Sequence, residues 1–260
     1  MKESRINRKI IRKLGYRSDQ QGIINRYLRE MGQWDTHLYR CRKYIIDSIN
    51  IYQPDKVTFL GSGWLLDIPL EEIVDKCGCI NLVDIMHPSQ VIHKASAYKN
   101  VRLIEDDLTA GALEGIWKVY RNKLDIGDLK INVYEPDYET GMVFSVNLLT
   151  QLDSLPADFI AKHKMVGTSE LRKIRKDMQR VHINFLKKND SVLITDYIEY
   201  LKKEDAVTDT NDLVFTTLPG GRRKEEWTWD FDNTGNYYTG KRVIFGVKAI
   251  DMVKKHNERD

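Results

Sequence analysis

From residue 57 onward, short runs of β-branched and other apolar residues alternate with segments of helical periodicity. The runs VTFLG, INLVDI and VRLIEDDL are separated by DIPLEEIVDKC and HPSQVIHKASAY. Downstream, the same alternation predicts a helix at 113–123, a strand at 142–148, a helix at 169–188 and a strand at 191–197. Strands that alternate with helices form right-handed β-α-β units. The pattern therefore predicts an α/β fold with a mostly parallel sheet covered on both faces.

Proline and acidic residues mark the expected helix starts within this alternation. Asp67 is placed to act as an N-cap, with Pro69 in the first helical turn, and Pro88 opens the next helix. Near the end of the chain, EEWTWDF and KRVIFGVKAIDM are typical of two closing strands. The polar stretch 202–226 is predicted to be a connection, long enough to form a lid or a mobile loop.

The first fifty residues follow a different pattern. Apolar residues recur three or four positions apart, which predicts amphipathic helices. The recurring residues are Ile24, Leu28, Met31, Trp34, Leu38, Cys41, Tyr44 and Ile45. Gly32 is expected to separate two of these helices. We therefore divide the chain into an N-terminal helical cap at 1–52 and a Rossmann-like domain at 53–260.

The net charge of +3 is unevenly distributed along the 260 residues. Residues 1–50 carry 12 Lys and Arg against 5 Asp and Glu, which leaves about −4 for the rest of the chain. The basic end fits a solvated helical face better than a nucleic-acid arm, because no aromatic interleaving or nucleic-acid motif accompanies it. Nucleic acid is therefore not expected as a partner.

A glycine turn in VTFLGSGWLLD carries the first functional signal. In an open parallel sheet, ligands bind beyond the carboxyl ends of the strands, and glycines there let the backbone approach a ligand. Gly61 and Gly63 occupy this turn, but Leu66 replaces the third glycine of a dinucleotide fingerprint. The turn therefore favours a ligand without phosphates over NAD.

Acidic residues stand at the ends of the next two predicted strands. Asp84 closes INLVD, where its carboxylate can accept hydrogen bonds from ribose hydroxyls. Asp106 and Asp107 close VRLIEDD, where a carboxylate can accept from an adenine amino group. Each of them alone also fits a solvated carboxylate or a helix cap. The glycine turn, Asp84 and Asp107 follow one another in this order along the chain, and together they predict a nucleoside site.

The succession LGSGWLLDIPLEEI, LVDI, RLIEDDLT, VFSVNLLTQL and VLITDYIEY resembles bacterial class I S-adenosylmethionine-dependent methyltransferases over about residues 57–252. The resemblance implies a Rossmann-like, doubly wound sheet of seven strands whose last strand is antiparallel. It also implies S-adenosylmethionine as the cofactor, held by Gly61, Ser62, Gly63, Asp84, Ile85, Asp106, Asp107, Leu108 and Asn147.

The resemblance also assigns roles within this set. Asp84 holds the ribose, Asp107 and Leu108 edge the adenine, and Asn147 faces the methionine part. The chain departs from the family pattern at Phe59, because an acidic residue is usual two places before the first glycine.

The methyl acceptor has a weaker signature. The chain has SVNLLTQLDSLP where DNA amino-methyltransferases usually carry [DNS]-P-P-[YFW]. All its cysteines precede the position of a pyrimidine C5 nucleophile. Candidate substrate contacts are His37, Gln151, His182 and Tyr197, although a hydrogen-bonded histidine at a core edge and a packed strand-end tyrosine are competing explanations for the last two. No general base is assigned and no metal is expected.

Three functions remain open at this point. The first is a methyltransferase acting on a small molecule. The second is a catalytically inactive protein that binds S-adenosylmethionine or nucleic acid, and the third transfers the aminopropyl group, as nicotianamine synthases do. The sequence contains no signal peptide and no membrane-spanning apolar run, so a cytoplasmic location is expected. It does not specify an oligomeric state.

Overall fold

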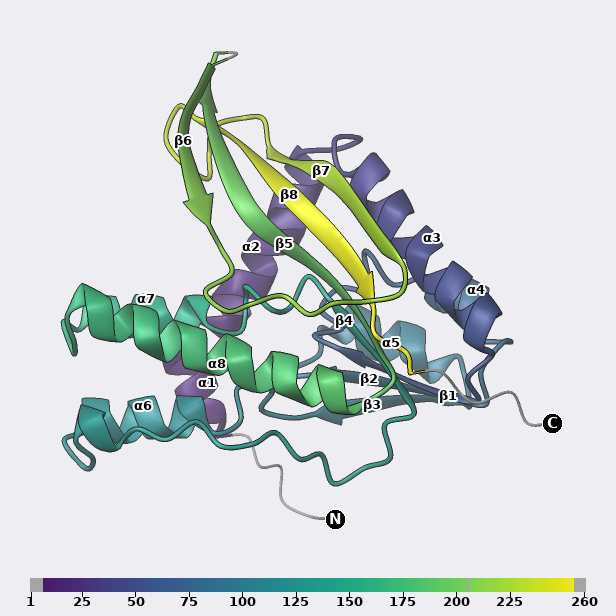
Figure 1. Cartoon of the computed structure of the whole chain (residues 1–260), viewed down its shortest axis with the longest axis horizontal. Coiled ribbons are helices and arrows are strands. Elements are labelled where there is room, and N and C mark those ends of the chain that lie inside the picture. Colours follow the sequence, from purple (N-terminus) through teal and green to yellow (C-terminus); the bar gives the residue numbers. More distant parts are fainter. Residues whose placement is uncertain (1–6, 205, 255–260) are drawn as a thin grey trace.

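The computed structural model of the chain describes residues 7–204 and 206–254, which form an α/β fold around one eight-stranded sheet (Figure 1). The strand order is β3-β2-β1-β4-β5-β8-β7, with β6 pairing with β5 beside this path. The strands are β1 (Lys56–Leu60), β2 (Cys79–Asp84), β3 (Val101–Glu105), β4 (Met142–Val146), β5 (Ser191–Lys203), β6 (Ala206–Asp212), β7 (Lys224–Asp232) and β8 (Arg242–Asp251).

Strands β1 to β5 pair in parallel, whereas β8 runs antiparallel to both β5 and β7. The predicted Rossmann-like arrangement, mostly parallel with an antiparallel last strand, is therefore confirmed. The predicted number of seven strands is wrong, because β6 forms an antiparallel hairpin with β5. This strand lies inside 202–226, which the sequence analysis treated as a connection. All the residues of β6 are exposed, so no apolar alternation marked it.

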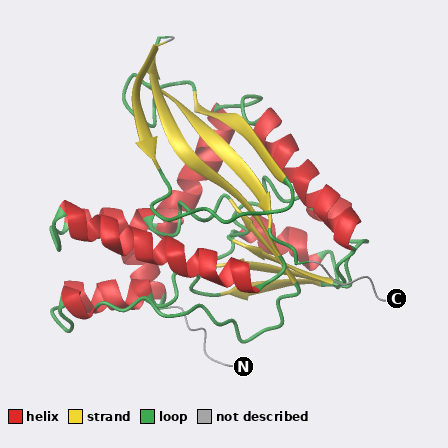
Figure 2. Cartoon of the chain, viewed as in Figure 1, coloured by secondary structure: helices red, strands yellow, loops and turns green. Residues whose placement is uncertain are grey.

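Helices cover both faces of the sheet (Figure 2). They are α1 (Arg8–Leu14), α2 (Tyr16–Arg29), α3 (Asp35–Tyr52), α4 (Leu70–Ile73), α5 (Ser89–Ser96), α6 (Ala112–Tyr120), α7 (Ser154–Lys162) and α8 (Thr168–Lys188). One buried cluster joins α3, α4 and α5 to side chains such as Phe59 and Leu82. Another joins α8 to Leu60 and Val83 on the opposite face. Successive strand residues point to opposite faces of the sheet, and both faces are covered. The sequences of β1 and β2 are therefore nearly continuous apolar runs.

The N-terminal helices pack onto the sheet. The apolar stripe of α3 predicted from the sequence is buried, including Leu38, Cys41 and Ile45, and α3 contacts β7. Two glycines with positive φ shape this region, Gly15 between α1 and α2 (φ 90°) and Gly32 in the turn before α3 (φ 83°). A left-handed backbone at these points suits glycine, as expected for the separator at Gly32.

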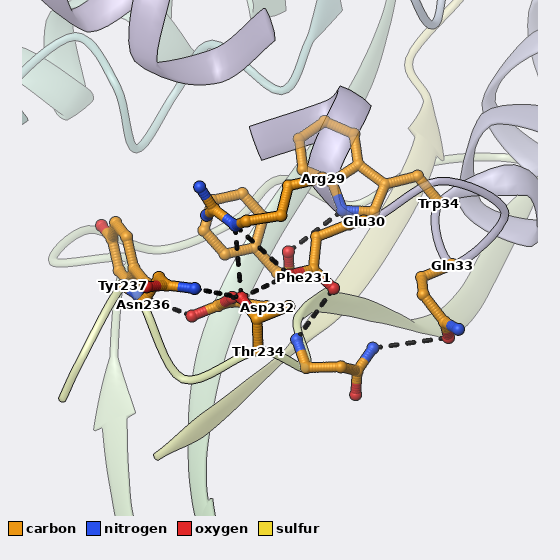
Figure 3. Close-up of polar contacts among 10 residues, drawn as sticks. Arg29, Glu30, Gln33, Trp34, Phe231, Asp232, Thr234, Asn236 and Tyr237 are labelled. Atoms are coloured by element: carbon orange, nitrogen blue, oxygen red, sulfur yellow. Dashed lines mark hydrogen bonds and ion pairs between the residues drawn. The ribbon is translucent and has the colours of Figure 1, made fainter. Parts of the chain in front are cut away.

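A polar network ties the α2–α3 turn to the loop after β7 (Figure 3). Glu30, which is buried, accepts hydrogen bonds from the backbone N–H of Asn233 (3.0 Å) and from the hydroxyl of Thr234 (2.9 Å). Asp232, buried beside it, accepts from the backbone N–H of Tyr237 (2.6 Å). The N-terminal helices are therefore held to the last part of the sheet by specific polar contacts as well as by apolar packing.

Two local predictions need correction. Asp67 is not an N-cap: α4 begins at Leu70 after Pro69 and spans only four residues, and no side chain caps it. The predicted helix over DIPLEEIVDKC is therefore confined to Leu70–Ile73, and a turn follows it. Helix α7, which the sequence analysis did not predict, follows directly on the loop after β4. Among the described residues, no helix is both long and apolar enough to cross a bilayer.

Candidate functional site

The strand order reverses between β1 and β4, and a pocket opens at the carboxyl ends of the strands beside this point. In open α/β sheets this switch point is where ligands bind. The pocket contains about 1060 Å³ of space free of protein atoms, part of it open to solvent. The glycine turn forms one wall, and side chains of α2 and α3, including Ile23 and Leu38, cover it.

The glycine turn connects β1 to the pocket. The backbone N–H groups of Gly61 and Ser62 donate to the carbonyl oxygen of Val83 at 2.9 and 3.1 Å, which fixes the turn against β2. Gly61 has a φ of 74°, and a Cβ there would lie 2.8 Å from a terminal methyl carbon of Leu148. A larger residue at this position would be strained and would crowd the pocket wall.

Asp84 lies at the end of β2 and lines the pocket, as predicted. Its carboxylate accepts hydrogen bonds from the backbone N–H groups of Gly63 and Ile85, each at 2.7 Å. Burial raises the pKa of Asp84, and these hydrogen bonds act in the opposite direction. An ionised carboxylate has about four acceptor sites, so Asp84 retains the capacity to accept from a ligand hydroxyl beside these backbone donors.

The two aspartates after β3 take different directions. Asp107 lines the pocket, and its carboxylate accepts from the backbone N–H of Thr109 at 2.9 Å and from the Thr109 hydroxyl at 2.5 Å. Asp106 turns away and accepts from the hydroxyl of Tyr134 at 2.8 Å beside a neighbouring cavity. Leu108 and Ile85 also line the main pocket. Of this predicted group, only Asp106 is absent from the pocket wall.

Asn147 directly follows β4, and its side-chain amide contacts both Asp67 and His37. Its Nδ2 lies 2.8 Å from a carboxylate oxygen of Asp67 and 3.1 Å from Nε2 of His37. His37 stacks on Trp229 at a centroid distance of 3.9 Å, and the indole N–H of Trp227 donates to its Nδ1 at 3.1 Å. Burial lowers the pKa of His37 to about 3.

Two buried side-chain oxygens in the pocket wall lack a partner among residues 7–204 and 206–254. They are the hydroxyl oxygen of Ser62 and Oδ1 of Asn147. An unpaired buried polar atom costs about 1–3 kcal/mol. A ligand that hydrogen-bonds to these atoms would recover this free energy.

The pocket wall is acidic. Four carboxyl groups line it, from Asp19, Asp67, Asp84 and Asp107, and none of the described residues that line it is Lys or Arg. A phosphate group would be repelled by the ionised members of this set, whereas a cationic ligand would be attracted. Within the described parts of the chain, no group of three or more His, Cys, Asp or Glu side chains could hold a metal ion.

The four residues predicted to contact the methyl acceptor fall into two pairs, one that lines the pocket and one that does not. His37 and Gln151 line the pocket. His182 is buried under the opposite face of the sheet, where its Nε2 lies 2.8 Å from the hydroxyl of Ser145. Tyr197 donates to Glu226 and lies beneath the ammonium group of Lys248. Neither His182 nor Tyr197 lines the pocket.

The sequence analysis missed Asp196, near the carboxyl end of the parallel part of β5. Asp196 is buried, and its carboxyl group accepts from the hydroxyl of Thr150 at 2.6 Å, just behind the pocket-lining Gln151. Burial raises the pKa of Asp196 to about 6. Asp84 and Asp107 were identified by the strand-end rule, which looks for acidic side chains at the carboxyl ends of predicted strands. The same rule applies to VLITD and would have found Asp196.

No protein-family model and no curated protein matches the sequence. Among solved structures, the chain is similar to one described as the methyltransferase domain of bacterial-CtHen1-CN, with a TM-score of 0.32 and 12% identity. The similarity covers 81% of this chain and 97% of that chain. At this TM-score the similarity supports no conclusion about activity, and the Rossmann-like fold is defined by the strand order and pairing.

Proposed function

We propose that the protein is an S-adenosylmethionine-dependent methyltransferase that acts on a small-molecule acceptor. The observation that carries the proposal is the pocket at the β1/β4 switch point, with four carboxyl groups and no Lys or Arg among the described residues of its wall. S-adenosylmethionine is a sulfonium cation without phosphates, so this wall complements its charge. The ends of β2 and β3 supply the carboxylates of Asp84 and Asp107 that a nucleoside requires.

A dinucleotide fits the same pocket poorly. Pyrophosphate binding in this fold uses a third glycine and the N-terminus of the helix that follows. Here Leu66 replaces the glycine, and the following helix α4 has only four residues and begins at Leu70. The acidic wall adds repulsion to this missing geometry.

In the proposed complex, Asp84 would hold the ribose hydroxyls, Asp107 the adenine amino group and Asn147 the methionine part. Gly61 and Gly63 would let the backbone lie against the ligand. The unpaired hydroxyl of Ser62 and the one unpaired amide atom of Asn147 support this assignment, because ligand groups would complete their hydrogen bonds.

S-adenosylmethionine supplies a methyl group activated by its positively charged sulfur. Methyl transfer is an in-line displacement, which alignment and exclusion of water can accelerate. Trp34, Leu38 and Trp229 line the pocket and supply apolar surface that would limit the access of water to a bound cofactor. His37 is buried and neutral, and both its ring nitrogens have partners, so it serves better in holding Asn147 than as a base.

The first experiment is calorimetry of the full chain with S-adenosylmethionine, S-adenosylhomocysteine and NADH. We expect the first two to bind and NADH not to. Asp84→Ala should weaken binding by about 1.5–3 kcal/mol, the range for losing charge-assisted hydrogen bonds. Asp106→Ala is the matched control, because Asp106 follows the neighbouring strand but faces another cavity. Binding of NADH alone, or equal losses in the two variants with unchanged melting temperatures, would overturn the assignment.

The reaction itself is tested by incubating the protein with labelled S-adenosylmethionine and a metabolite extract. A methyltransferase converts the cofactor to S-adenosylhomocysteine, whereas transfer of the aminopropyl group gives methylthioadenosine. Mass spectrometry of the products therefore distinguishes these two activities. Cofactor binding without any turnover, combined with salt-dependent binding of RNA, would instead identify a catalytically inactive binding protein.

A further inference from the structure

The positions of the protons around Asn147 determine which end of its amide group faces the pocket. One amide atom lies between Nε2 of His37 (3.1 Å) and Oδ2 of Asp67 (2.8 Å). The other amide atom, described above as Oδ1, is buried and has no partner among the described residues, and Asn147 is one of the residues that line the pocket. An amide nitrogen and oxygen have nearly the same shape, so their places are decided by which neighbours donate and which accept.

Trp227 fixes the proton on His37. An indole N–H can only donate, and this one lies 3.1 Å from Nδ1 of His37. Nδ1 must therefore accept and carries no proton. Burial lowers the pKa of His37 to about 3, so the ring is neutral at neutral pH and its single proton is on Nε2. Nε2 therefore donates. Its neighbours are the amide of Asn147 at 3.1 Å and Sγ of Cys41 at 3.6 Å, and the amide makes the shorter contact.

An NH2 group of Asn147 beside this donor would oppose two N–H groups at 3.1 Å. Moving the proton to Nδ1 creates the same conflict with Trp227, and a cationic ring creates both conflicts. Among these side chains, the arrangement without conflict places Oδ1 of Asn147 beside His37. Oδ1 then accepts from Nε2, and Asp67, 2.8 Å away, supplies the second proton as a carboxylic acid. Burial raises the pKa of Asp67, in the direction that this protonated form requires.

We propose that Trp227, His37 and protonated Asp67 hold Asn147 with its NH2 group toward the pocket, so that this end selects a ligand carrying a carboxylate. The inference rests on the proposed function, in which Asn147 faces the amino-acid group of S-adenosylmethionine. With Asp67 and His37 both neutral, neither side chain repels a carboxylate or competes for it. Asn147 is the ligand-binding residue, and the other three are positioning residues.

The protonation pattern can be measured on the free, full-length protein. Nitrogen NMR of ¹⁵N-histidine-labelled protein distinguishes protonated from unprotonated ring nitrogens, and a His37→Gln variant assigns the signals of His37. We expect a neutral ring with its proton on Nε2 at neutral pH. A proton on Nδ1, or an imidazolium ring, would overturn the inference whatever the protein binds.

Trp227→Phe tests the consequence for the ligand, because it keeps an aromatic ring but removes the N–H group that holds Nδ1 as an acceptor. His37 can then change tautomer, and Asn147 can turn its carbonyl oxygen toward the pocket. Calorimetry should compare S-adenosylmethionine with its decarboxylated analogue. We expect the wild-type preference for the carboxylate-bearing ligand to fall about tenfold or more in this variant, as for the loss of one charge-assisted hydrogen bond.

Trp229→Phe is the matched control. Trp229 stacks on the same imidazole ring, but its indole N–H is buried without a partner among the described residues, so the variant leaves the proton positions unchanged. It should retain the preference between the two ligands, even if both affinities fall together. Equal preferences in the wild type and Trp227→Phe would overturn the inference and leave the proposed function standing. Binding of neither ligand by the wild type would overturn both.

Discussion

The two faces of the sheet each bury a histidine next to β4, and the two histidines lie in different kinds of site. His182 of α8 contacts the hydroxyl of Ser145. His37 of α3 contacts the amide of Asn147, only two residues further along the chain. Side chains two apart on a strand point to the same face. Asn147 has a φ of 50°, a left-handed conformation that ends this alternation. Its side chain therefore joins the pocket and not the α8 face.

The two sites differ in their hydrogen bonding and not in their pKa shifts. Burial lowers the pKa of both histidines, to about 3 for His37 and about 4 for His182, so the pKa shift does not distinguish the two sites. The hydrogen-bond inventory does. Among the described residues, neither Ser145 nor His182 has a buried unpartnered atom, whereas Asn147 does. The pocket face therefore carries an unpaired polar atom on Asn147, whereas Ser145 and His182 on the α8 face are paired with each other.

The largest expected effect comes from removing residues 1–52, which uncovers the pocket face and leaves α8 in place. The removed segment contributes buried side chains such as Tyr44, Ile45 and Ile49, and each fully buried large apolar side chain stabilises by about 1.5–3 kcal/mol. We expect the truncated chain to lose its cooperative thermal transition and to aggregate, as measured by calorimetry and light scattering. The full chain with Arg12→Glu and Lys13→Glu, both exposed, should remain folded. A soluble truncation that still binds cofactor would show that the pocket face needs no cover.

The two histidines should contribute alike to acid sensitivity. Each has a folded pKa far below the unfolded value of about 6.5, so the unfolded state takes up the proton first. Stability is therefore complete above about pH 6.5 and is lost as the pH falls toward the folded pKa, by about 1.4 kcal/mol per pH unit for each histidine. Between neutral pH and about pH 4.5, His182→Gln should therefore lose about 3 kcal/mol less free energy of unfolding than the wild type loses. Urea titrations of the wild type, His182→Gln and His37→Gln across this range measure the difference. Parallel pH profiles for wild type and either variant would show that the corresponding ring is not neutral in the fold.

For Asp196, the expected pH dependence of stability has the opposite sign to that of the two histidines. Burial raises its pKa to about 6, above the unfolded value of about 3.9, so the folded state holds the proton more tightly. Its contribution to stability is therefore favourable at low pH and is lost as the pH rises from about 4 to about 6. Asp196→Asn should then raise the free energy of unfolding by about 3 kcal/mol at pH about 8 and change it little at pH about 4. A stabilisation that does not depend on pH would contradict the raised pKa.

The smallest effect separates packing on the pocket face from contact with the ligand. Phe59 is fully buried and stacks on Phe144 at a centroid distance of 5.0 Å, without lining the pocket. Phe59→Leu should cost about 1 kcal/mol of stability and leave cofactor affinity unchanged. Gly61→Ala is the contrasting variant, because its methyl group would approach Leu148 in the pocket wall. Thermal melts measure the stability of both variants, and calorimetry measures their cofactor affinity. Weaker binding by Phe59→Leu would contradict a purely packing role for Phe59.

Much of this architecture was predictable from the sequence because parallel strands buried on both faces leave a plain signal. The apolar runs located β1, β2, β4 and β8, and the strand-end rule placed Asp84 and Asp107 at one edge. The same rule did not separate Asp106 from Asp107, since the turn after β3 decides which carboxylate points inward. The exposed strand β6 had no alternation to detect.

The network around the pocket could not be predicted in the same way. His37 was a candidate because of its place on the helical pattern of α3, but its partners come from β7, 190 residues away, and from the loop after β4, 110 residues away. Asp67 was assigned to a helix cap because local spacing favoured one, and the contact with Asn147 took precedence. Tertiary contacts of this kind override local preference and leave no periodic trace.

The position of β8 also determines when the site can exist during synthesis. Within the described sheet, β7 pairs only with β8, and β8 fills the place between β7 and β5. Trp229, which lines the pocket, and Trp227, which contacts His37, both lie on β7. A ribosome releases the glycine turn, Asp84 and Asp107 long before Arg242, yet β7 has no strand to pair with until β8 has emerged. A nascent chain that ends before β8 would carry the glycine turn, Asp84 and Asp107 with no fixed tryptophan wall. Under the proposed function, cofactor binding should therefore begin only when β8 has left the exit tunnel.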